Sequence, residues 1–423
     1  MIGCDIAYAA RLTADKESIP MQYSIARILP VLTIPTALMA AVASYIGIRL
    51  MDGFSLHPVW QLAAWTLLML PAAFIPAMGI SATVPTGKWM DGFLSLTYLA
   101  LGLFSFLFVF TVARDLLWVA ARGIDSLSRT LGGDGGTLWP AILPADYTVL
   151  QAWNSIANRI IIILSAVLFL LGAANALRPP KLVRVNISIE NLHPDLERFR
   201  IAQLSDIHLG PFSDGGRLNT IIEKVNGLSP DMVAITGDLV DGPVARLGND
   251  ARLLTQIDAP VFFVHGNHES YWGPAAWTRF LTSHGIDVLV SEHRLLRKGR
   301  AEVLVAGVPD LSTGGFQRVS PSPPETALAG APPADFRLLL AHQPGSALQA
   351  AGLGYDLQLS GHTHGGQFFP WNLIIDWVQP FATGLHRHKG MWIYTSRGTG
   401  SWGPPVRLGS PTEITLIELK SAD

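Results

Sequence analysis

The stretch Phe199-Arg200-Ile201-Ala202-Gln203-Leu204-Ser205-Asp206-Ile207-His208 joins a short apolar run to an acid and a histidine. The run to Leu204 has the length and composition of a buried β-strand. Asp206 and His208 follow in a polar loop, and their i, i+2 spacing lets both side chains reach one site if the loop bends. A single Asp-x-His is usually chance, so its meaning depends on the rest of the chain.

The same arrangement recurs four more times. We expect apolar strands at 231–235, 260–264, 336–340 and 356–359, and polar clusters follow each of them: Gly237-Asp238-Leu239-Val240-Asp241, Gly266-Asn267-His268-Glu269, His342 and Gly361-His362-Thr363-His364. In open α/β sheets, ligands bind at the carboxyl ends of strands, so the five clusters should meet at one edge. Oxygen and nitrogen ligands without cysteine favour Mn²⁺, Fe or Zn²⁺ over Ca²⁺.

The segments around these strands predict the fold class. Helical apolar spacing runs through 218–228, and further helices are expected at 251–257 and 275–283. Other strand candidates lie at 183–189, 286–290, 302–306, 392–395 and 413–419. Alternating strands and helices predict an α/β domain with mixed β-sheets flanked by helices. Pro179-Pro180 end the preceding helix, so we place this domain at 183–423.

The five blocks together resemble the calcineurin-like metallophosphoesterases. The resemblance rests on Asp206-x-His208, Gly237-Asp238-x-x-Asp241, Gly266-Asn267-His268-Glu269, His342 and Gly361-His362-x-His364, all in family order. It covers residues 183–423. Two further segments look like those of the bacterial membrane-associated branch of this family: Gly365-Gly366-Gln367 and Ser396-Arg397-Gly398-Thr399-Gly400. That branch is similar to proteins that carry a membrane anchor before the catalytic domain.

The resemblance implies a role for each matched residue. Two divalent metal ions, Mn, Fe or Zn, would be held by one group each: Asp206, His208 and His364 for one, and Asn267, His342 and His362 for the other. Asp238 would bridge the metals, and His268 would be the catalytic histidine. Asp241 and Glu269 would orient the metal ligands through hydrogen bonds. The implied reaction is hydrolysis of phosphoester or pyrophosphate bonds by a hydroxide that the two metals activate.

The residues before 178 have a different character. The whole chain is 49% hydrophobic and 15% charged, with a mean hydropathy of +0.33, yet eleven of its 12 histidines lie beyond residue 178. Uncharged stretches at about 28–48, 60–80, 92–113 and 160–177 approach the roughly 20 residues that span a bilayer core. We therefore expect a leader at 1–27 and a membrane region at 28–177 with four transmembrane helices. Two alternatives, buried helices of a soluble protein and a signal peptide at the first stretch, fit less well.

The connections between the spans give a weak indication of orientation. The segment 119–158, with Gly132-Gly133-Asp134-Gly135-Gly136, is interpreted as an irregular loop, and Arg114-Asp115 as an interfacial end of the third span. With the N-terminus inside, inner segments carry seven basic residues: Arg11, Lys16, Arg27, Lys88, Arg178, Lys181 and Arg184. Outer segments carry five: Arg49, Arg114, Arg122, Arg129 and Arg159. This bias favours a catalytic domain on the cytoplasmic side of a bacterial plasma membrane.

The membrane region suggests the substrate. Four spans motivate a lipid-linked phosphorylated substrate, and the aromatic segment 368–377 could place the site at the lipid surface. The alternatives are a phosphoesterase for a soluble nucleotide or phosphoprotein, and a membrane sensor with a metal-binding domain. A net charge of −2 disfavours a nucleic-acid partner, and the single Cys4 excludes a cysteine-cluster metal site. The sequence leaves the oligomeric state open.

Overall fold

The apolar strands of the C-terminal half form two six-stranded sheets in the computed structural model, which describes residues 25–52, 54–83, 88–131, 147–310 and 323–422. The first sheet has the order β1 (Lys181–Ile189), β12 (Glu413–Ser421), β2 (Arg200–Leu204), β3 (Met232–Ile235), β4 (Val261–Phe263), β5 (Asp287–Val288). The second has the order β10 (Gly384–His388), β11 (Met391–Thr395), β9 (Leu357–Ser360), β8 (Phe336–Ala341), β7 (Ala301–Val308), β6 (Glu292–Lys298). Both sheets are mixed: β2, β3, β4 and β5 pair in parallel, whereas β12 pairs antiparallel to β2.

The two sheets pack face to face because their strands alternate apolar side chains between two cores. Ile201 and Met232 face the second sheet, in a core that also contains Leu338. Their neighbours Ala202 and Val233 face the opposite way. A sheet whose two faces are both apolar must be covered on both sides, so helices cover the outer faces.

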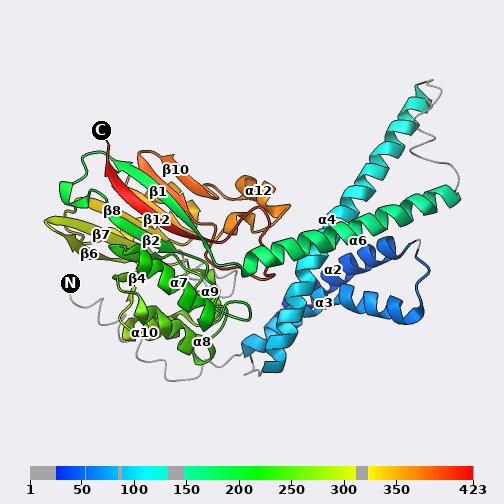
Figure 1. Ribbon diagram of the computed structural model, residues 1–423, viewed down its shortest axis with the longest axis horizontal. Helices are drawn as coiled ribbons and strands as arrows, with labels where there is room; N and C mark the ends of the chain where they lie inside the picture. Colours follow the sequence, from blue (N-terminus) through cyan, green and yellow to red (C-terminus); the bar gives the residue numbers. More distant parts are fainter. Residues whose placement is uncertain (1–24, 53, 84–87, 132–146, 311–322, 423) are drawn as a thin grey trace.

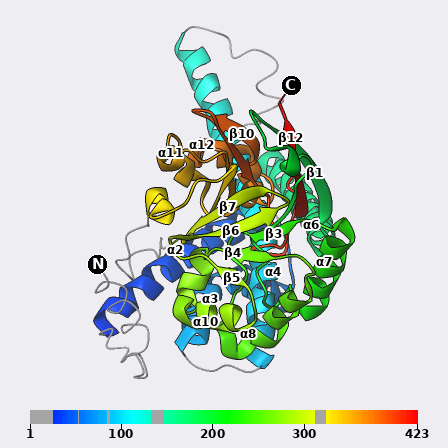
Figure 2. The ribbon, with the colours of Figure 1, turned by 90° about the vertical axis from the view of Figure 1, so that its left-hand side faces the viewer.

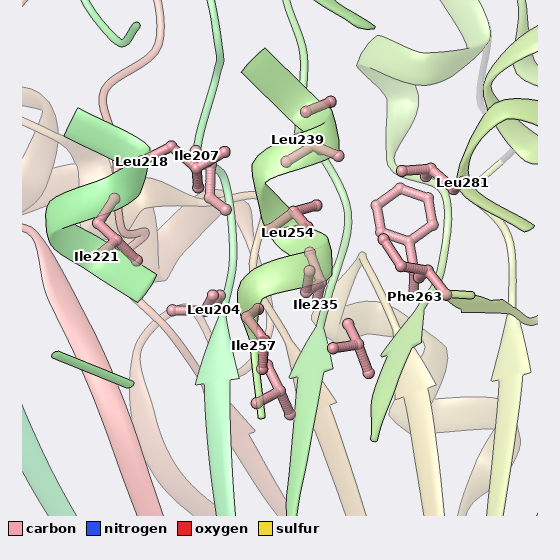
Figure 3. Close-up of a cluster of buried hydrophobic side chains, with 14 of the residues drawn as sticks. Leu204, Ile207, Leu218, Ile221, Ile235, Leu239, Leu254, Ile257, Phe263 and Leu281 are labelled. Carbon is pink, nitrogen blue, oxygen red and sulfur yellow. The ribbon is translucent and has the colours of Figure 1, made fainter. Parts of the chain in front are cut away.

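Helices lie on the outer faces of both sheets (Figures 1 and 2). The first sheet is covered by α7 (Gly215–Leu228), α8 (Val244–Ala251) and α10 (Pro274–Ser283). Figure 3 shows Leu218 and Ile221 of α7 beside Leu204 of β2. The second sheet is covered by the 3₁₀ helix η3 (Pro324–Leu328) and by α11 (Ala347–Ala350). The predicted fold class is confirmed.

The helix expected at 251–257 is wrong in its position. α8 begins after Pro243 and ends at Ala251, and residues 252–256 form the 3₁₀ helix η2 (Arg252–Gln256). Pro243 explains the early start, because proline is favoured where a helix begins. Further short elements are η1 (Pro194–Leu196), α9 (Asn267–Tyr271), η4 (Pro344–Ser346), η5 (His364–Gly366) and α12 (Trp371–Val378).

Four helices of the described residues are long and apolar enough to cross a membrane: α2 (Ile25–Met51), α3 (Pro58–Thr83), α4 (Lys88–Thr130) and α6 (Tyr147–Leu177). In Figure 1 they stand beside the two-sheet unit, and α4 is the longest of them. The interpretation of 119–158 as an irregular loop is wrong for 119–130 and 147–158, which are helical, while 132–146 lie outside the described residues.

A polar cluster explains why α4 continues beyond Arg114-Asp115. Asp115 accepts hydrogen bonds from Arg49 of α2, at 2.7 and 2.9 Å, and from Tyr45 at 2.6 Å. Arg114 contacts Asn158 of α6, which donates in turn to backbone carbonyls at the end of α2. Because these charges have partners on neighbouring helices, they do not end the helix.

Candidate metal centre and active site

The five predicted polar clusters lie together at the carboxyl ends of β2, β3, β4, β8 and β9. Backbone hydrogen bonds join the loops: the amide of Asp206 donates to Gly237 and that of His208 to Asp238, both at 3.0 Å. The amide of Gly361 donates to His342 at 2.9 Å, which joins the loops of the second sheet in the same way. The predicted residues that this edge brings together are Asp206, His208, Asp238, Asp241, Asn267, His268, Glu269, His342, His362 and His364.

One group of three side chains directs its ligand atoms at a common point. Nε2 of His208 lies 3.1 Å from Nε2 of His364, and Oδ1 of Asp206 lies 3.4 Å from Nε2 of His364. All three residues are buried. Two imidazole nitrogens and a carboxylate oxygen lie close enough together for one cation to bind all three, so the donor set fits a metal ion.

A second group faces the first. Nε2 of His342 lies 3.2 Å from Oδ1 of Asn267, and Nδ1 of His362 lies 3.2 Å from Nε2 of His342 and 3.1 Å from Oδ1 of Asn267. Nδ1 of His342 lies 2.7 Å from the carbonyl oxygen of Thr236, an acceptor, so the ring proton belongs on Nδ1 and Nε2 can bind a cation. This set fits a metal ion as well.

Asp238 stands between the two groups. Its Oδ1 accepts a hydrogen bond from the amide of His268 at 2.9 Å, which fixes the carboxylate plane. Its Oδ2 lies 3.2 Å from Nε2 of His342 and 3.9 Å from Nε2 of His208, one residue from each group. Burial alone would raise the pKa of Asp238, but His342 and His268 hold it well below its usual value. Oδ2 is therefore an anionic oxygen placed between two ligand sets.

The loops that carry these side chains are strained. Asp206, His208, Asp238, His362 and His364 all have positive φ, between 50° and 71°, a region that residues with a Cβ atom rarely occupy. Such strain persists only where the surrounding structure holds it in place, and it gathers at functional sites. Gly266 shows how tightly the loops pack, because a Cβ there would collide with Oδ1 of Asp238.

Asp241 joins a ligand histidine to the predicted catalytic histidine. Its Oδ1 lies 3.0 Å from Nδ1 of His208 and 2.6 Å from Nδ1 of His268. This leaves Nε2 of His208 facing the first group and Nε2 of His268 at 3.9 Å from Oδ2 of Asp238. Burial lowers the pKa of His268, but Asp238 and Asp241 outweigh burial and raise it to about 9. Protonated His268 can therefore donate a proton near neutral pH.

Glu269 stabilises the loops after β3 and β4 by accepting hydrogen bonds from their backbone amides. Its carboxylate accepts hydrogen bonds from the amides of Gly266 and Leu239, each at 2.7 Å, and from that of Asp238 at 3.1 Å. The side chain is buried. Burial and the nearby Asp238 raise the pKa of Glu269 to about 7, against the effect of the Gly266 amide. Glu269 thus joins the β3 and β4 loops and contacts neither ligand group through its own oxygens.

Arg407 is a site residue that the sequence reasoning missed. It is buried, and it donates to the carbonyl oxygens of His364 at 3.0 Å and Arg397 at 2.8 Å. Its Nη2 lies 2.8 Å from Nδ1 of His364. A guanidinium only donates, so this contact favours the His364 tautomer with its proton on Nε2. Metal binding through Nε2 needs the other neutral tautomer, in which Nδ1 carries the proton. Burial lowers the pKa of Arg407 to about 9.

The block 396–400 forms backbone hydrogen bonds with the loop that carries Asp206 and His208. The amide of Thr399 donates to the carbonyl of Ser205 at 2.7 Å, and that of Gly400 to the carbonyl of Asp206 at 2.9 Å. The side chain of Gln367 binds the backbone of Trp402, donating at 2.7 Å and accepting at 2.9 Å. Trp402 is thereby fixed beside the two ligand groups.

A cavity of about 500 Å³ opens from the ligand groups toward the membrane helices. Asn267, His268 and Asp238 line one side of it. The opposite side is formed by α3 and α4, through Phe74, Ile75, Leu94 and Tyr98. This volume lies within the roughly 300–1,000 Å³ of small-molecule sites. A molecule at the ligand groups would therefore also contact apolar side chains of the membrane helices.

Residues 199–366 match the sequence profile of the calcineurin-like phosphoesterases. A Danio rerio protein named transmembrane protein with metallophosphoesterase domain is 40% identical over 271 residues, which are 62% of this chain and 62% of that protein. Its Bos taurus namesake is 32% identical over 320 residues, 73% of this chain and 67% of that protein. An uncharacterized metallophosphoesterase of Campylobacter jejuni is 36% identical over 265 residues, 62% of this chain and 68% of that protein. The chain belongs to the calcineurin-like phosphoesterase family.

The chain therefore contains the predicted metallophosphoesterase domain of a metal-dependent family, and its described residues include groups able to bind metal ions. The similarity includes animal as well as bacterial proteins, so it is not confined to a bacterial branch. The apolar helices and the two relatives named transmembrane proteins indicate a membrane protein. The match spans 62% of the Danio rerio protein, so more than a third of that relative has no counterpart in the match.

Proposed function

We propose that this protein is a membrane-anchored phosphoesterase that uses two divalent metal ions to hydrolyse a lipid-linked phosphoester or pyrophosphate. The observation that carries the proposal is the position of Asp238, whose Oδ2 lies between two sets of ligand atoms. A shared carboxylate oxygen is the feature that distinguishes a two-metal centre from two separate sites.

Seven side chains would hold the metals. Asp206, His208 and His364 would bind one ion, Asn267, His342 and His362 the other, and Asp238 both. Mixed nitrogen and oxygen donors without thiolate suit Mn, Fe or Zn. When bound, the two ions neutralise phosphate charge and lower the pKa of a water molecule that attacks phosphorus.

His268 would supply the proton that the leaving group needs. Hydrolysis adds a water oxygen to phosphorus, breaks the bond from phosphorus to the leaving oxygen, and transfers one proton to that oxygen. His268 lines the cavity beside the ligand groups, and Asp241 holds its ring through Nδ1 at 2.6 Å. Its Nε2 is therefore the donor that faces the substrate.

The lipid-linked substrate is supported by the wall of the cavity. Phe74 and Ile75 of α3, and Leu94 and Tyr98 of α4, face the predicted catalytic histidine across about 500 Å³. Because α3 and α4 are long and apolar enough to cross a membrane, a substrate at the ligand groups would lie against the membrane region, where a lipid-linked ester is found. The cytoplasmic placement of the catalytic unit rests on the charge count, and a reporter fused after Asp423 tests it.

The test is metal-dependent hydrolysis by the full-length protein, purified in detergent and stripped of metal. We expect bis(p-nitrophenyl) phosphate or p-nitrophenyl phosphate to be hydrolysed after Mn²⁺ is added. Asp238→Ala should lower turnover by roughly 1,000-fold, because the site loses the oxygen that both ions share.

Asp258→Ala is the matched control, since Asp258 is an exposed acid of the same unit. It should retain wild-type turnover. Wild-type turnover in Asp238→Ala, with two metal ions bound per chain, would refute the shared-ligand role. Failure of the wild type to hydrolyse any ester with Mn²⁺, Fe²⁺ or Zn²⁺ would argue against the enzyme itself.

A further inference from the structure

A second cavity, of about 410 Å³, meets the ligand groups on the other side of Trp402. His362, His364 and Trp402 line both cavities. The metal centre therefore stands where two cavities join, and a phosphoester bound there can extend one substituent into each of them.

The two cavities differ in charge. The first is lined by Asp238, Asp241 and Arg246 as well as apolar side chains, and His268 lines this cavity. The second has no Asp, Glu, Lys or Arg among the described residues that line it. Its walls include Leu101, Phe368, Trp371 and Ile375, together with the uncharged polar side chains of Gln367 and Gln379, and the proposed ligands His362 and His364 also line it. A hydrocarbon chain fits the second cavity better, because no charged group there must lose water.

The second cavity lies between a membrane helix and α12. Leu101 and Ser105 belong to α4, and Trp371 of α12 donates a hydrogen bond to the Ser105 hydroxyl at 3.1 Å. The outward side of α12 exposes large apolar side chains, with Trp377 86% exposed and Leu373 61% exposed. α12 thus carries exposed apolar side chains and also lines an uncharged cavity, the arrangement that a lipid chain needs to reach the metal centre from a bilayer.

We propose that the cavity between α4 and α12 holds the hydrocarbon chain of an amphiphilic phosphodiester or pyrophosphate, while the polar leaving group lies in the cavity that contains His268. This inference rests on the proposed function and specifies its substrate. His268 would protonate the leaving oxygen and lines the first cavity. The leaving group must therefore lie in the first cavity, and the bond that breaks is the one between phosphorus and that group. The chain in the second cavity stays on the phosphoryl product, so the products are a lipid phosphate and a polar alcohol or phosphate.

The test uses full-length protein in lipid nanodiscs with Mn²⁺ and p-nitrophenyl phosphodiesters that carry a methyl, butyl or octyl group. A buried methylene contributes about fourfold in affinity, so kcat/KM should rise by at least about 100-fold from methyl to octyl in the wild type. Leu101→Trp and Ile375→Trp fill the second cavity from opposite walls, and each should lower the octyl-to-methyl ratio at least tenfold.

Two control variants test whether the change in the octyl-to-methyl ratio is specific to the second cavity. Leu94→Trp adds the same bulk to the first cavity, and Leu96→Phe adds bulk to an exposed position of α4. Both should keep the octyl-to-methyl ratio within twofold of wild type. A ratio lowered by Leu94→Trp and unchanged in Leu101→Trp and Ile375→Trp would overturn the assignment of the chain to the second cavity.

Two further outcomes separate this inference from the proposed function. Equal Mn²⁺-dependent turnover of methyl and octyl esters would overturn the chain site and leave the phosphoesterase standing. Absence of turnover for every ester would overturn both. A binding measurement needs no turnover: an octyl phosphonate with a terminal diazirine should crosslink to residues 101–105 or to α12, and crosslinks at Phe74 or Leu94 instead would refute the proposal.

Discussion

Asp241 acts on two histidines through one oxygen. Its Oδ1 contacts Nδ1 of His208 and Nδ1 of His268, so the carboxylate fixes the ring of a proposed metal ligand and that of the proposed acid together. A carboxylate in this position makes the ligand histidine more basic and fixes its tautomer. Burial would raise the pKa of Asp241, but His208 and His268 outweigh burial and lower it strongly.

Asp241→Asn should therefore lower kcat/KM by roughly 10–100-fold. The loss should be larger for an alkyl leaving group than for p-nitrophenol, because p-nitrophenolate leaves without a proton and the alkoxide needs the one from His268. Steady-state kinetics on both ester types, with Asp258→Asn as the control for charge, measure this. An equal loss on both esters would show that Asp241 only supports the metal ligands.

At the residue scale, the sequence indicated the proposed ligands and two supporting residues, Asp241 and Glu269, but not the supports that come from a later loop. Asp206, Asp238 and His342 could be predicted because each follows an apolar strand, and a sheet brings strand ends together whatever the loop length. Arg407 and Trp402 reach the site from a later loop with no local pattern. Their contribution depends on tertiary contacts, of which the only sequence signal was the glycine-rich block at 396–400.

At the element scale, edge strands were the ones missed. β6 and β10 each pair with a single neighbour, and their exposed side chains include Arg294, Arg297 and Arg387. Charged edge strands avoid pairing with other molecules, so their sequences resemble loops. α12 was recognised as an aromatic segment, but its helical form was not predicted, because its eight residues are fewer than the roughly 11 needed to establish a helical period.

The exposure of α12 predicts a membrane contact. None of the eight residues of this helix is buried, although six of them are large and apolar. Replacing Leu373 and Trp377 together by Ser should lower kcat/KM about tenfold on a bilayer-embedded ester and leave bis(p-nitrophenyl) phosphate unaffected, because the metal centre does not change. Leu348→Ser, at an exposed position on α11, is the control. Unchanged turnover of the embedded ester in the double variant would make α12 a surface helix without a lipid role.

At the scale of the whole molecule, α4 connects the membrane helices to the catalytic unit. On one side it packs with α2, α3 and α6 through Phe104 and Leu107. On the other, Phe106 packs against Phe368 and Val406, and Asp91 forms an ion pair with Arg246 at 2.9 Å. The contacts run from residue 91 to residue 110, where Phe110 stacks on Phe369, a length of roughly 28 Å along the helix.

Apolar side chains make most of this contact, so α4 covers part of the apolar surface of the catalytic unit. A protein cut to residues 179–423 would expose Phe368, Phe369, Val406 and Leu408 as one patch, and a patch of that kind drives association. We expect this fragment to form oligomers in buffer and to become monomeric in detergent, as measured by size-exclusion chromatography with light scattering. Phe369→Ser with Leu408→Ser should raise its monomer fraction in buffer. A fragment that is monomeric and active without detergent would show that the catalytic unit is complete by itself, and that α4 only tethers it.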